Sequence, residues 1–137
     1  MSRSSHHKVA SVPRPKSDAE LSGPAIRTFF RIADRWKLSA DEARKILGDP
    51  PRSTFFLWKR NGEANLSRDA LERISYVLGI YKALQILLPE PAAADGWVRQ
   101  PNSAPLFGSK PALARMLSGN VSDLYVVRQY LDGERGG

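Results

Sequence analysis

The 137-residue sequence contains no cysteine and only two histidines, His6 and His7. The lack of cysteine excludes disulfide bonds and thiolate chemistry, and it leaves the cytoplasm as the default compartment. A membrane-spanning helix requires about 18 consecutive apolar residues. No stretch of the sequence approaches this length, so no membrane partner is expected. The basic, Ser-rich start has no apolar run after it and therefore does not resemble a secretory signal.

Motifs of catalysis and of cofactor binding are missing as well. The sequence has no GxSxG elbow, Walker loop, HExxH motif or dinucleotide fingerprint. His6 and His7 are adjacent and lack a third ligand, so no metal site is predicted. Glu42 and Glu72 are better explained by helix capping and surface roles than as an acid–base pair. We therefore predict that the protein is not an enzyme, with no catalytic residues, no metal site and no cofactor.

The net charge of +7 is distributed unevenly along the chain. Residues 24–67 hold nine Lys and Arg against five Asp and Glu, whereas residues 89–137 hold five of each. A basic region followed by a neutral one suits a polyanionic partner for the first and a different partner for the second. The simpler alternative is a basic protein whose charge keeps it in solution.

The pattern of apolar residues predicts an all-α chain behind an N-terminal arm. Residues 1–22 carry spaced prolines and little periodicity, so we expect a disordered basic arm that can add loose phosphate contacts. A first helix is predicted from Pro24, with apolar residues at spacings of three and four as far as Trp36. A second helix is predicted to begin with a capping box at Ser39 and to end at Gly48 in a left-handed conformation.

The next helix carries the residue types of a DNA-reading helix. Asp49 is expected to cap it, Pro50 to occupy its first turn, and Gly62 to follow its end. Two short helices joined by a tight turn form a helix-turn-helix, whose second helix can enter a major groove. Arg, Ser, Thr and Lys can bond bases or phosphates, and Phe can contact a thymine methyl group. The candidate DNA-binding residues are Arg52, Ser53, Thr54, Phe56, Lys59 and Arg60. The alternative is a plain helical bundle with a solvated face.

The helix predicted from Ser67 to Leu88 has more apolar surface than one small bundle can cover. We expect its part from Val77 onward to pack against the C-terminal module or a second copy of the chain. Gly79 weakens this helix by about 1 kcal/mol relative to Ala, which suggests a close helix contact or a bend there. Residues 89–94 are expected to form a short, stiff linker.

The remaining residues predict a small, mostly helical module. One helix is expected to have Pro111 in its first turn, and another is expected to open at Asn120. Tyr125, Arg128 and Gln129 are expected to remain largely outside, as is typical of the anchors of a protein interface. The predicted domains are thus an arm at residues 1–22, a DNA-binding and dimerisation domain at 23–88, and a partner-binding module at 89–137.

Two sets of residues resemble the Xre/MbcA/ParS antitoxin family. The N-terminal set comprises residues 38–43, 53–59 and 71–84. The C-terminal set, which is the more specific, comprises Trp97, residues 101–102, 107–108, 117–119, 127–132 and 135–137. The resemblance extends from about residue 25 to the end. It departs from the family pattern at Pro50 and Pro51, where a small polar start of the recognition helix is usual, and at Pro111, where Ser-Pro is expected.

This resemblance implies a bacterial type II antitoxin. Its partner would be a RES-class toxin that consumes or uses NAD, and its C-terminal domain would cover the active site of that toxin. The N-terminal helices would form a homodimer and bind the double-stranded operator DNA of their own operon. The implied toxin-binding residues are Trp97, Asn102, Tyr125, Arg128, Gln129, Asp132, Glu134, Arg135, Gly136 and Gly137.

A physical hypothesis for inhibition follows from the last residues. A pocket that cleaves a nucleotide holds pyrophosphate with cationic groups, and Asp132, Glu134 or the terminal carboxylate could take the place of that anion. Gly133, Gly136 and Gly137 would let the backbone thread a narrow cleft. Two rival functions remain: a stand-alone helix-turn-helix transcriptional regulator, and a structural adaptor without a DNA role.

Overall fold

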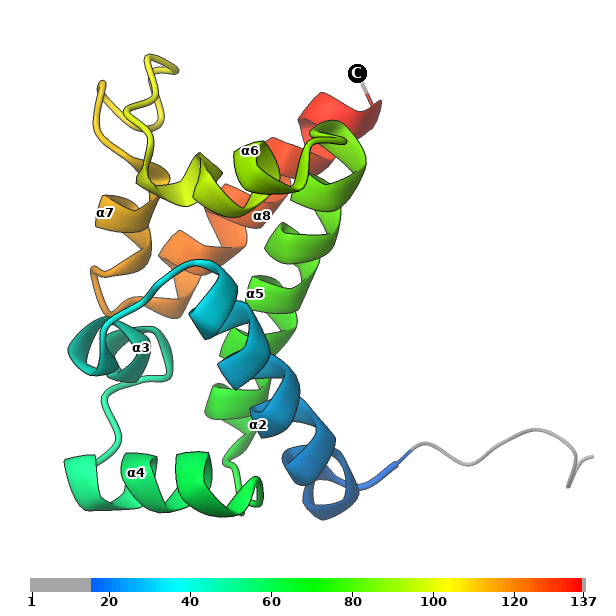
Figure 1. Cartoon of the computed structure of the whole chain (residues 1–137), viewed down its shortest axis with the longest axis vertical. Coiled ribbons are helices and arrows are strands. Elements are labelled where there is room, and N and C mark those ends of the chain that lie inside the picture. Colours follow the sequence, from blue (N-terminus) through cyan, green and yellow to red (C-terminus); the bar gives the residue numbers. More distant parts are fainter. Residues whose placement is uncertain (1–15, 137) are drawn as a thin grey trace, which may run out of the picture.

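The computed structural model describes residues 16–136, and within this range the chain is helical except for one isolated bridge between Pro101 and Pro111. The elements are α2 (Asp18–Arg35), α3 (Ala40–Ile46), α4 (Arg52–Asn61), α5 (Arg68–Leu87), α6 (Pro91–Gly96), the 3-10 turn η1 (Trp97–Arg99), α7 (Ala112–Met116) and α8 (Val121–Gly136). Figure 1 shows α4 at one end of the molecule and the loop between η1 and α7 at the other. The predicted all-α fold is confirmed.

Helix α2 begins earlier than its apolar periodicity indicated. The Ser17 hydroxyl accepts a hydrogen bond from the Glu20 backbone N–H at 3.2 Å, and the Glu20 carboxylate accepts one from the Ser17 N–H at 2.9 Å. This capping box is a stronger start signal than a proline, and Pro24 lies inside the helix. The start expected at Pro24 is therefore wrong, because residues 18–22 are helical. Residues 1–15 of the predicted arm, including His6 and His7, lie outside the described residues.

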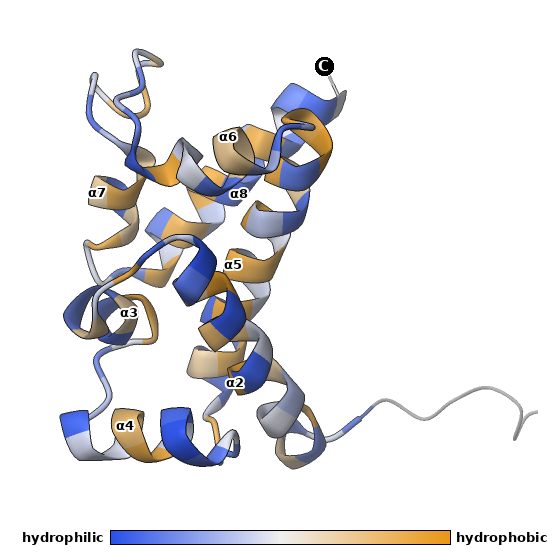
Figure 2. Cartoon of the chain, viewed as in Figure 1, coloured by the Kyte–Doolittle hydropathy of each residue, from blue (hydrophilic) through white to orange (hydrophobic). Residues whose placement is uncertain are grey.

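Helix α5 lies at the centre of the hydrophobic core. It packs against α2 along its first part and against α8 along its second, and α2 and α8 are its two main partners. Val77, Ile80 and Leu84 are completely buried in these contacts. Figure 2 shows the hydrophobic residues of α5 and α8 alternating with hydrophilic ones along each helix. The C-terminal helices therefore cover the apolar surface that the sequence left in excess, as predicted.

The turn between α3 and α4 matches the sequence prediction in part. The capping box of Ser39 is present, and Gly48 follows α3 with a φ of 94°, as predicted. Asp49, however, does not cap α4; it has a φ of 63° and lies 3.4 Å from the guanidinium of Arg44. Helix α4 starts only after Pro51, which is extended and provides no side-chain cap. The reason is that a proline disfavours the helical conformation in the residue before it, so two consecutive prolines delay the start.

Three predictions about the C-terminal segments are wrong. The expected linker contains α6, since Pro91 fits a first helical turn and the alanines that follow favour a helix. Pro111 precedes α7 in an extended conformation and is not part of its first turn. Helix α8 continues to Gly136, so Gly133 lies inside a helix and residues 132–136 do not form an extended tail.

Arg99 joins the C-terminal segments to the N-terminal helices. Its guanidinium donates to the carbonyl of Trp36 at 3.0 Å, to the carbonyl of Lys37 at 2.7 Å and to the carboxylate of Glu42 at 2.8 Å. Burial by itself would raise the pKa of Glu42, but the Ser39 N–H and the Arg99 guanidinium outweigh it and hold that pKa below its ordinary value. A carboxylate bound in this way stabilises the fold only while it is ionised.

We expect Glu42→Gln to lower the free energy of unfolding by about 1 kcal/mol at neutral pH and to have no effect in acid. Glutamine can still close the capping box, but it loses the charge that Arg99 binds. Because the folded pKa is depressed, the contribution of Glu42 is complete above its unfolded value of 4.5 and is lost as the pH falls through the folded value.

Urea unfolding across this pH range measures the effect. The control is Glu63→Gln, which removes the same charge from an exposed position. An equal loss at every pH would show that the charge of Glu42 is not responsible.

Candidate DNA-binding and protein-binding surfaces

Helix α4 is held against the bundle by one side only. Phe55 is 1% exposed, and its ring meets the edge of the Phe30 ring of α2 at 5.3 Å. At the end of the helix, the Arg27 guanidinium donates to the carbonyl of Gly62 at 2.8 Å. The opposite side of α4 therefore faces outward on a helix whose position is fixed by α2.

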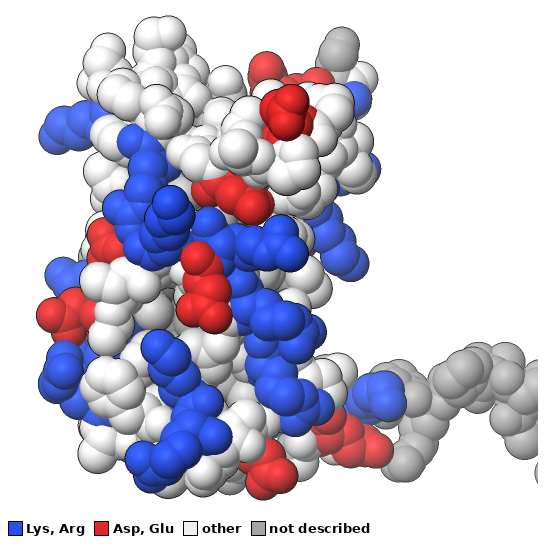
Figure 3. Space-filling model, viewed as in Figure 1, with Lys and Arg blue, Asp and Glu red and all other residues white. Residues whose placement is uncertain are grey.

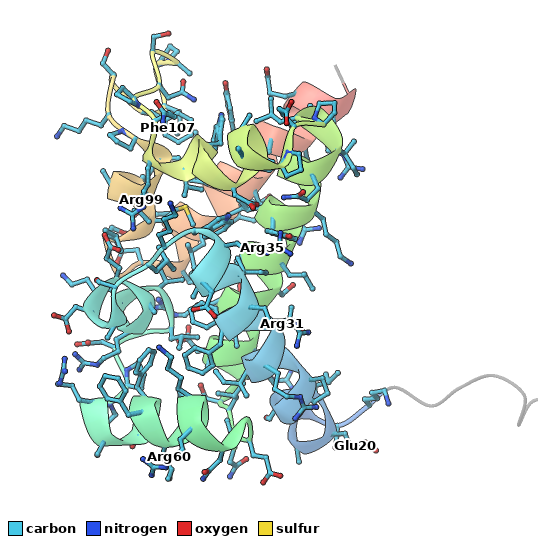
Figure 4. The ribbon with its side chains drawn as sticks, in the orientation of Figure 1. Glu20, Arg31, Arg35, Arg60, Arg99 and Phe107 are labelled. Atoms are coloured by element: carbon cyan, nitrogen blue, oxygen red, sulfur yellow. The ribbon has the colours of Figure 1, made fainter. Side chains whose placement is uncertain are left out.

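The candidate DNA-binding residues all lie on α4. Five of them are exposed, and Thr54 is half-buried. Arg52 forms an ion pair with Asp41 at 2.8 Å and lies over the Phe56 ring, 5.3 Å from its centroid. Lys59 and Arg60 have no ion pair within residues 16–136. Figure 4 shows Arg60 on the side of α4 that points away from the bundle. The structure thus brings the candidate residues to one outward surface and leaves two of its cations unpaired.

At the other end, α8 packs on α5 across Gly79. A Cβ atom placed on Gly79 would lie 2.5 Å from both Cζ and Nε of Arg128. The side chain of Arg128 therefore lies directly over Gly79, and its Nε is 3.5 Å from the Asp132 carboxylate. This confirms the close contact expected at Gly79. Arg128 is half-buried, however, so it is less exposed than the sequence suggested.

An aromatic cluster flanks the end of α8. The Phe107 ring lies 5.2 Å from the Tyr130 ring and 6.0 Å from the Trp97 ring, and both contacts are edge-on. Beside this cluster is a shallow cleft of about 190 Å³. The cleft is lined by Leu84, Leu87, Leu88, Trp97, Tyr130, Leu131 and Glu134. Trp97 and Glu134 are both candidate toxin-binding residues, but no pattern in the sequence indicates that they lie together. Tyr130 is not among the candidates, although this residue lies within the family-like segment 127–132.

Further along α8, Tyr125 and Gln129 form a second exposed group. The Gln129 amide donates to the Tyr125 hydroxyl at 3.2 Å, and the Tyr125 ring meets the Tyr76 ring at 5.6 Å. The hydroxyl of Tyr76 donates to Glu72 at 2.9 Å, which raises the pKa of Tyr76. Tyr125 itself is 45% exposed, as the sequence predicted for an interface anchor.

The remaining candidate toxin-binding residues are less closely grouped. Asn102 accepts a hydrogen bond from the Ala104 N–H at 2.9 Å and pairs through its backbone with Lys110, so its contacts stabilise the loop before α7. Arg135 lies 3.9 Å from the Asp132 carboxylate near the end of α8. Gly136 ends α8, and Gly137 lies outside the described residues.

Two further properties concern residues 16–136. They contain no group of three or more His, Cys, Asp or Glu side chains that could hold a metal ion. None of their helices combines the length and the apolar character needed to cross a membrane.

The fold and its two surfaces define a helix-turn-helix protein with an appended helical module. Residues 17–79 match the model of the antitoxin Xre-like helix-turn-helix domain, and residues 83–137 match that of the antitoxin Xre/MbcA/ParS C-terminal toxin-binding domain. The chain is 51% identical to the uncharacterized protein y4oB of Sinorhizobium fredii (strain NBRC 101917 / NGR234) over 123 residues, or 90% of this chain and 93% of that protein. The chain belongs to the Xre/MbcA/ParS antitoxin family, which confirms the resemblance seen in the sequence.

The contact between Gly79 and Arg128 predicts that their substitutions are coupled. In an Arg128→Ala background, Gly79→Ala should raise the free energy of unfolding by about 1 kcal/mol, the usual gain in helix propensity. With Arg128 present, the gain should be smaller, because the new methyl group must displace the guanidinium from its position near Asp132. A double-mutant cycle by chemical unfolding measures this coupling. The same gain in both backgrounds would show that the contact has no energetic weight.

Proposed function

We propose that this chain is the antitoxin of a type II toxin–antitoxin system, that it neutralises a RES-class, NAD-consuming toxin by covering the toxin's active site, and that it represses its own operon as a homodimer. The observation that carries the proposal is the match of residues 83–137 to a toxin-binding domain. The RES class of the partner and its use of NAD rest on the sequence resemblance. The antitoxin acts by binding and has no catalytic role of its own.

The outer surface of the C-terminal helices suits a protein partner. Exposed tyrosine and half-buried arginine side chains are typical of residues that contribute strongly to protein interfaces, and Tyr125 and Arg128 have these properties on α8. The cleft beside Trp97 and Tyr130 can receive an apolar side chain of the toxin. A rigid helix loses little conformational entropy on binding, which favours affinity.

The end of α8 suits a cationic active site. The carbonyl groups at the C-terminus of a helix carry partial negative charge, and Asp132 and Glu134 add exposed carboxylates there. A toxin that binds NAD must hold two phosphates with cationic groups, and these groups bind carboxylates as well. Because residues 132–136 are helical, we propose that the helix end occupies the site. This replaces the threaded backbone that the glycines suggested.

Co-expression with the product of the neighbouring gene tests this proposal. The full chain should form a stable complex with that product, restore growth and restore cellular NAD. The double variant Asp132→Asn, Glu134→Gln should still fold but lose most of the neutralisation, because it keeps the helix and removes two anions. Glu63→Gln, far from α8 in sequence and exposed on the N-terminal part, serves as the control.

Different failures have different meanings in this experiment. Full neutralisation by the double variant, and by a chain lacking residues 132–137, would contradict the role of the α8 end and leave the antitoxin role intact. No complex and no rescue by the full chain would contradict the antitoxin role. Operator binding without such a complex would then support the stand-alone transcriptional regulator.

The proposed binding of α4 to operator DNA leads to a separate prediction. Arg60 is exposed and has no ion pair within residues 16–136, so Arg60→Ala should leave the fold intact. If Arg60 binds a base edge, the substitution should weaken operator binding by about 1–3 kcal/mol and affect an unrelated duplex much less. Fluorescence anisotropy with both duplexes measures the difference. Unchanged operator affinity would indicate that α4 does not read the DNA through this residue.

A further inference from the structure

The outward side of α2 carries basic residues that are not among the candidate DNA-binding residues of α4. Three arginines, Arg27, Arg31 and Arg35, follow one another at intervals of four residues and are all exposed. In Figure 3, Lys and Arg side chains form a band over α2 and a separate group over α4 on the same face of the molecule. We propose that α2 contacts the phosphate backbone of the duplex that α4 enters. This inference rests on the proposed DNA role of α4.

The three arginines differ in how much each contributes to the stability of the fold. Arg27 donates to the carbonyl of Gly62, so part of its role is to hold the end of α4. Arg35 lies 3.5 Å from the Asp95 carboxylate and in the last turn of α2, where a cation is favoured by the helix dipole. Both positions are therefore explained in part by the stability of the fold.

Arg31 has no comparable structural role. Within residues 16–136 it forms no ion pair, and its one hydrogen bond goes to the hydroxyl of Thr28 at 3.2 Å, one turn earlier on the same helix. Arg31 precedes the last turn of α2, so the helix dipole does little to stabilise its positive charge. Figure 4 shows Arg31 and Arg35 on the outer side of α2. An exposed guanidinium without an acidic partner is free to bind an anion from another molecule.

The spacing of the arginines fits a nucleic-acid strand. Four residues of an α-helix rise about 6 Å, so Arg27 and Arg35 are separated by about 12 Å along the axis of α2. This distance corresponds to the rise of about three to four nucleotides on one strand. A helix with this spacing can reach successive phosphates of a single strand without entering a groove.

The position of α2 relative to α4 is fixed by two contacts already described. The Phe30 ring of α2 meets the Phe55 ring of α4, and Arg27 binds the carbonyl that follows α4. A duplex that receives α4 in its major groove, about 12 Å wide, therefore places its backbone at a defined distance from α2. Contacts of this kind set the orientation of the protein on the DNA and carry no sequence information.

Acidic residues limit the extent of this surface. Asp18 and Glu20 lie in the first turn of α2, so the basic surface does not reach the start of the helix. Asp34 is exposed three residues after Arg31, so it lies on the same face of the helix, and it lines one shallow hollow together with Arg31 and Arg35. The surface that we assign to phosphate is therefore the part of α2 from Arg27 to Arg31.

Binding to two duplexes over a range of salt concentrations tests the inference. One duplex comes from the region upstream of the operon, and the other has the same composition in scrambled order. Arg31→Ala should weaken binding to both duplexes by the same factor and reduce the slope of log K against log salt by about 0.9, the value for one phosphate contact. Arg31→Lys should keep most of the affinity and the slope, because it keeps the charge.

The matched control is Lys110→Ala. Lys110 is also exposed and has no ion pair within residues 16–136, but it lies in the loop at the end of the molecule opposite α4 (Figure 1). This variant should bind both duplexes as the unmodified chain does. Thermal unfolding of each variant confirms that the fold is unchanged.

The outcomes separate this inference from the proposed function. Unchanged affinity and slope for Arg31→Ala, with operator binding by the unmodified chain retained, would overturn the role of α2 alone. Weakened binding to the operator but not to the scrambled duplex would also overturn it, since a phosphate contact affects both. If the unmodified chain binds neither duplex, the DNA role of α4 is wrong and the inference about α2 is wrong with it.

Discussion

The structure depends on the burial of α5 between α2 and α8. Val77, Ile80, Ala83 and Leu84 are inaccessible to solvent in these contacts. Complete burial of a Leu, Ile or Val side chain stabilises a protein by about 1.5–3 kcal/mol, so these few residues supply a large share of the stability of a small domain. Because the N-terminal and C-terminal helices pack on one helix, the protein has one continuous core. The two surfaces are therefore held in a fixed relation.

Polar contacts reinforce that relation at two places. Arg99 binds the carbonyl groups of Trp36 and Lys37, which follow α2, and the carboxylate of Glu42 at the start of α3. Arg128 crosses α5 where Gly79 leaves space for its side chain. These contacts connect the module that matches the toxin-binding domain to the helices that match the helix-turn-helix domain.

The charges on the surfaces of α2 and α4 differ from those at the end of α8, so the two regions suit different partners. Unpaired cations are found on the outward sides of α2 and α4, where a polyanion would bind. The end of α8 instead combines exposed carboxylates with aromatic side chains and a cleft that both leucine side chains and Glu134 line. The two arginines of this surface, Arg128 and Arg135, lie close to Asp132, so the surface suits a protein partner better than a polyanion. The two partners that we propose, DNA and a toxin, would thus meet surfaces of different chemistry on one small chain.

Local signals in the sequence were sufficient for most of the helices. The predicted capping box at Ser39 and the predicted turn at Gly48 are confirmed, because each depends on residues only a few positions apart. The capping box at Ser17 is an equally local signal, although the apolar periodicity alone places the start of the helix at Pro24. The prediction for the start of α4 is wrong for a similar local reason. Asp49 is a favourable capping residue, but the two prolines that follow it disfavour a helix at these positions.

The sequence alone predicts the all-α fold, the family and the surplus of apolar surface on α5. It also placed the candidate DNA-binding residues on one helix, because neighbours on a helix follow from its period. The packing of the helices brings Arg99 to the carbonyl group of Trp36 and places Arg128 over Gly79. It also brings Trp97, Tyr130 and Glu134 to one cleft. These contacts join residues that are far apart in the chain, and a periodic pattern carries no information about which distant side chains meet when the helices pack.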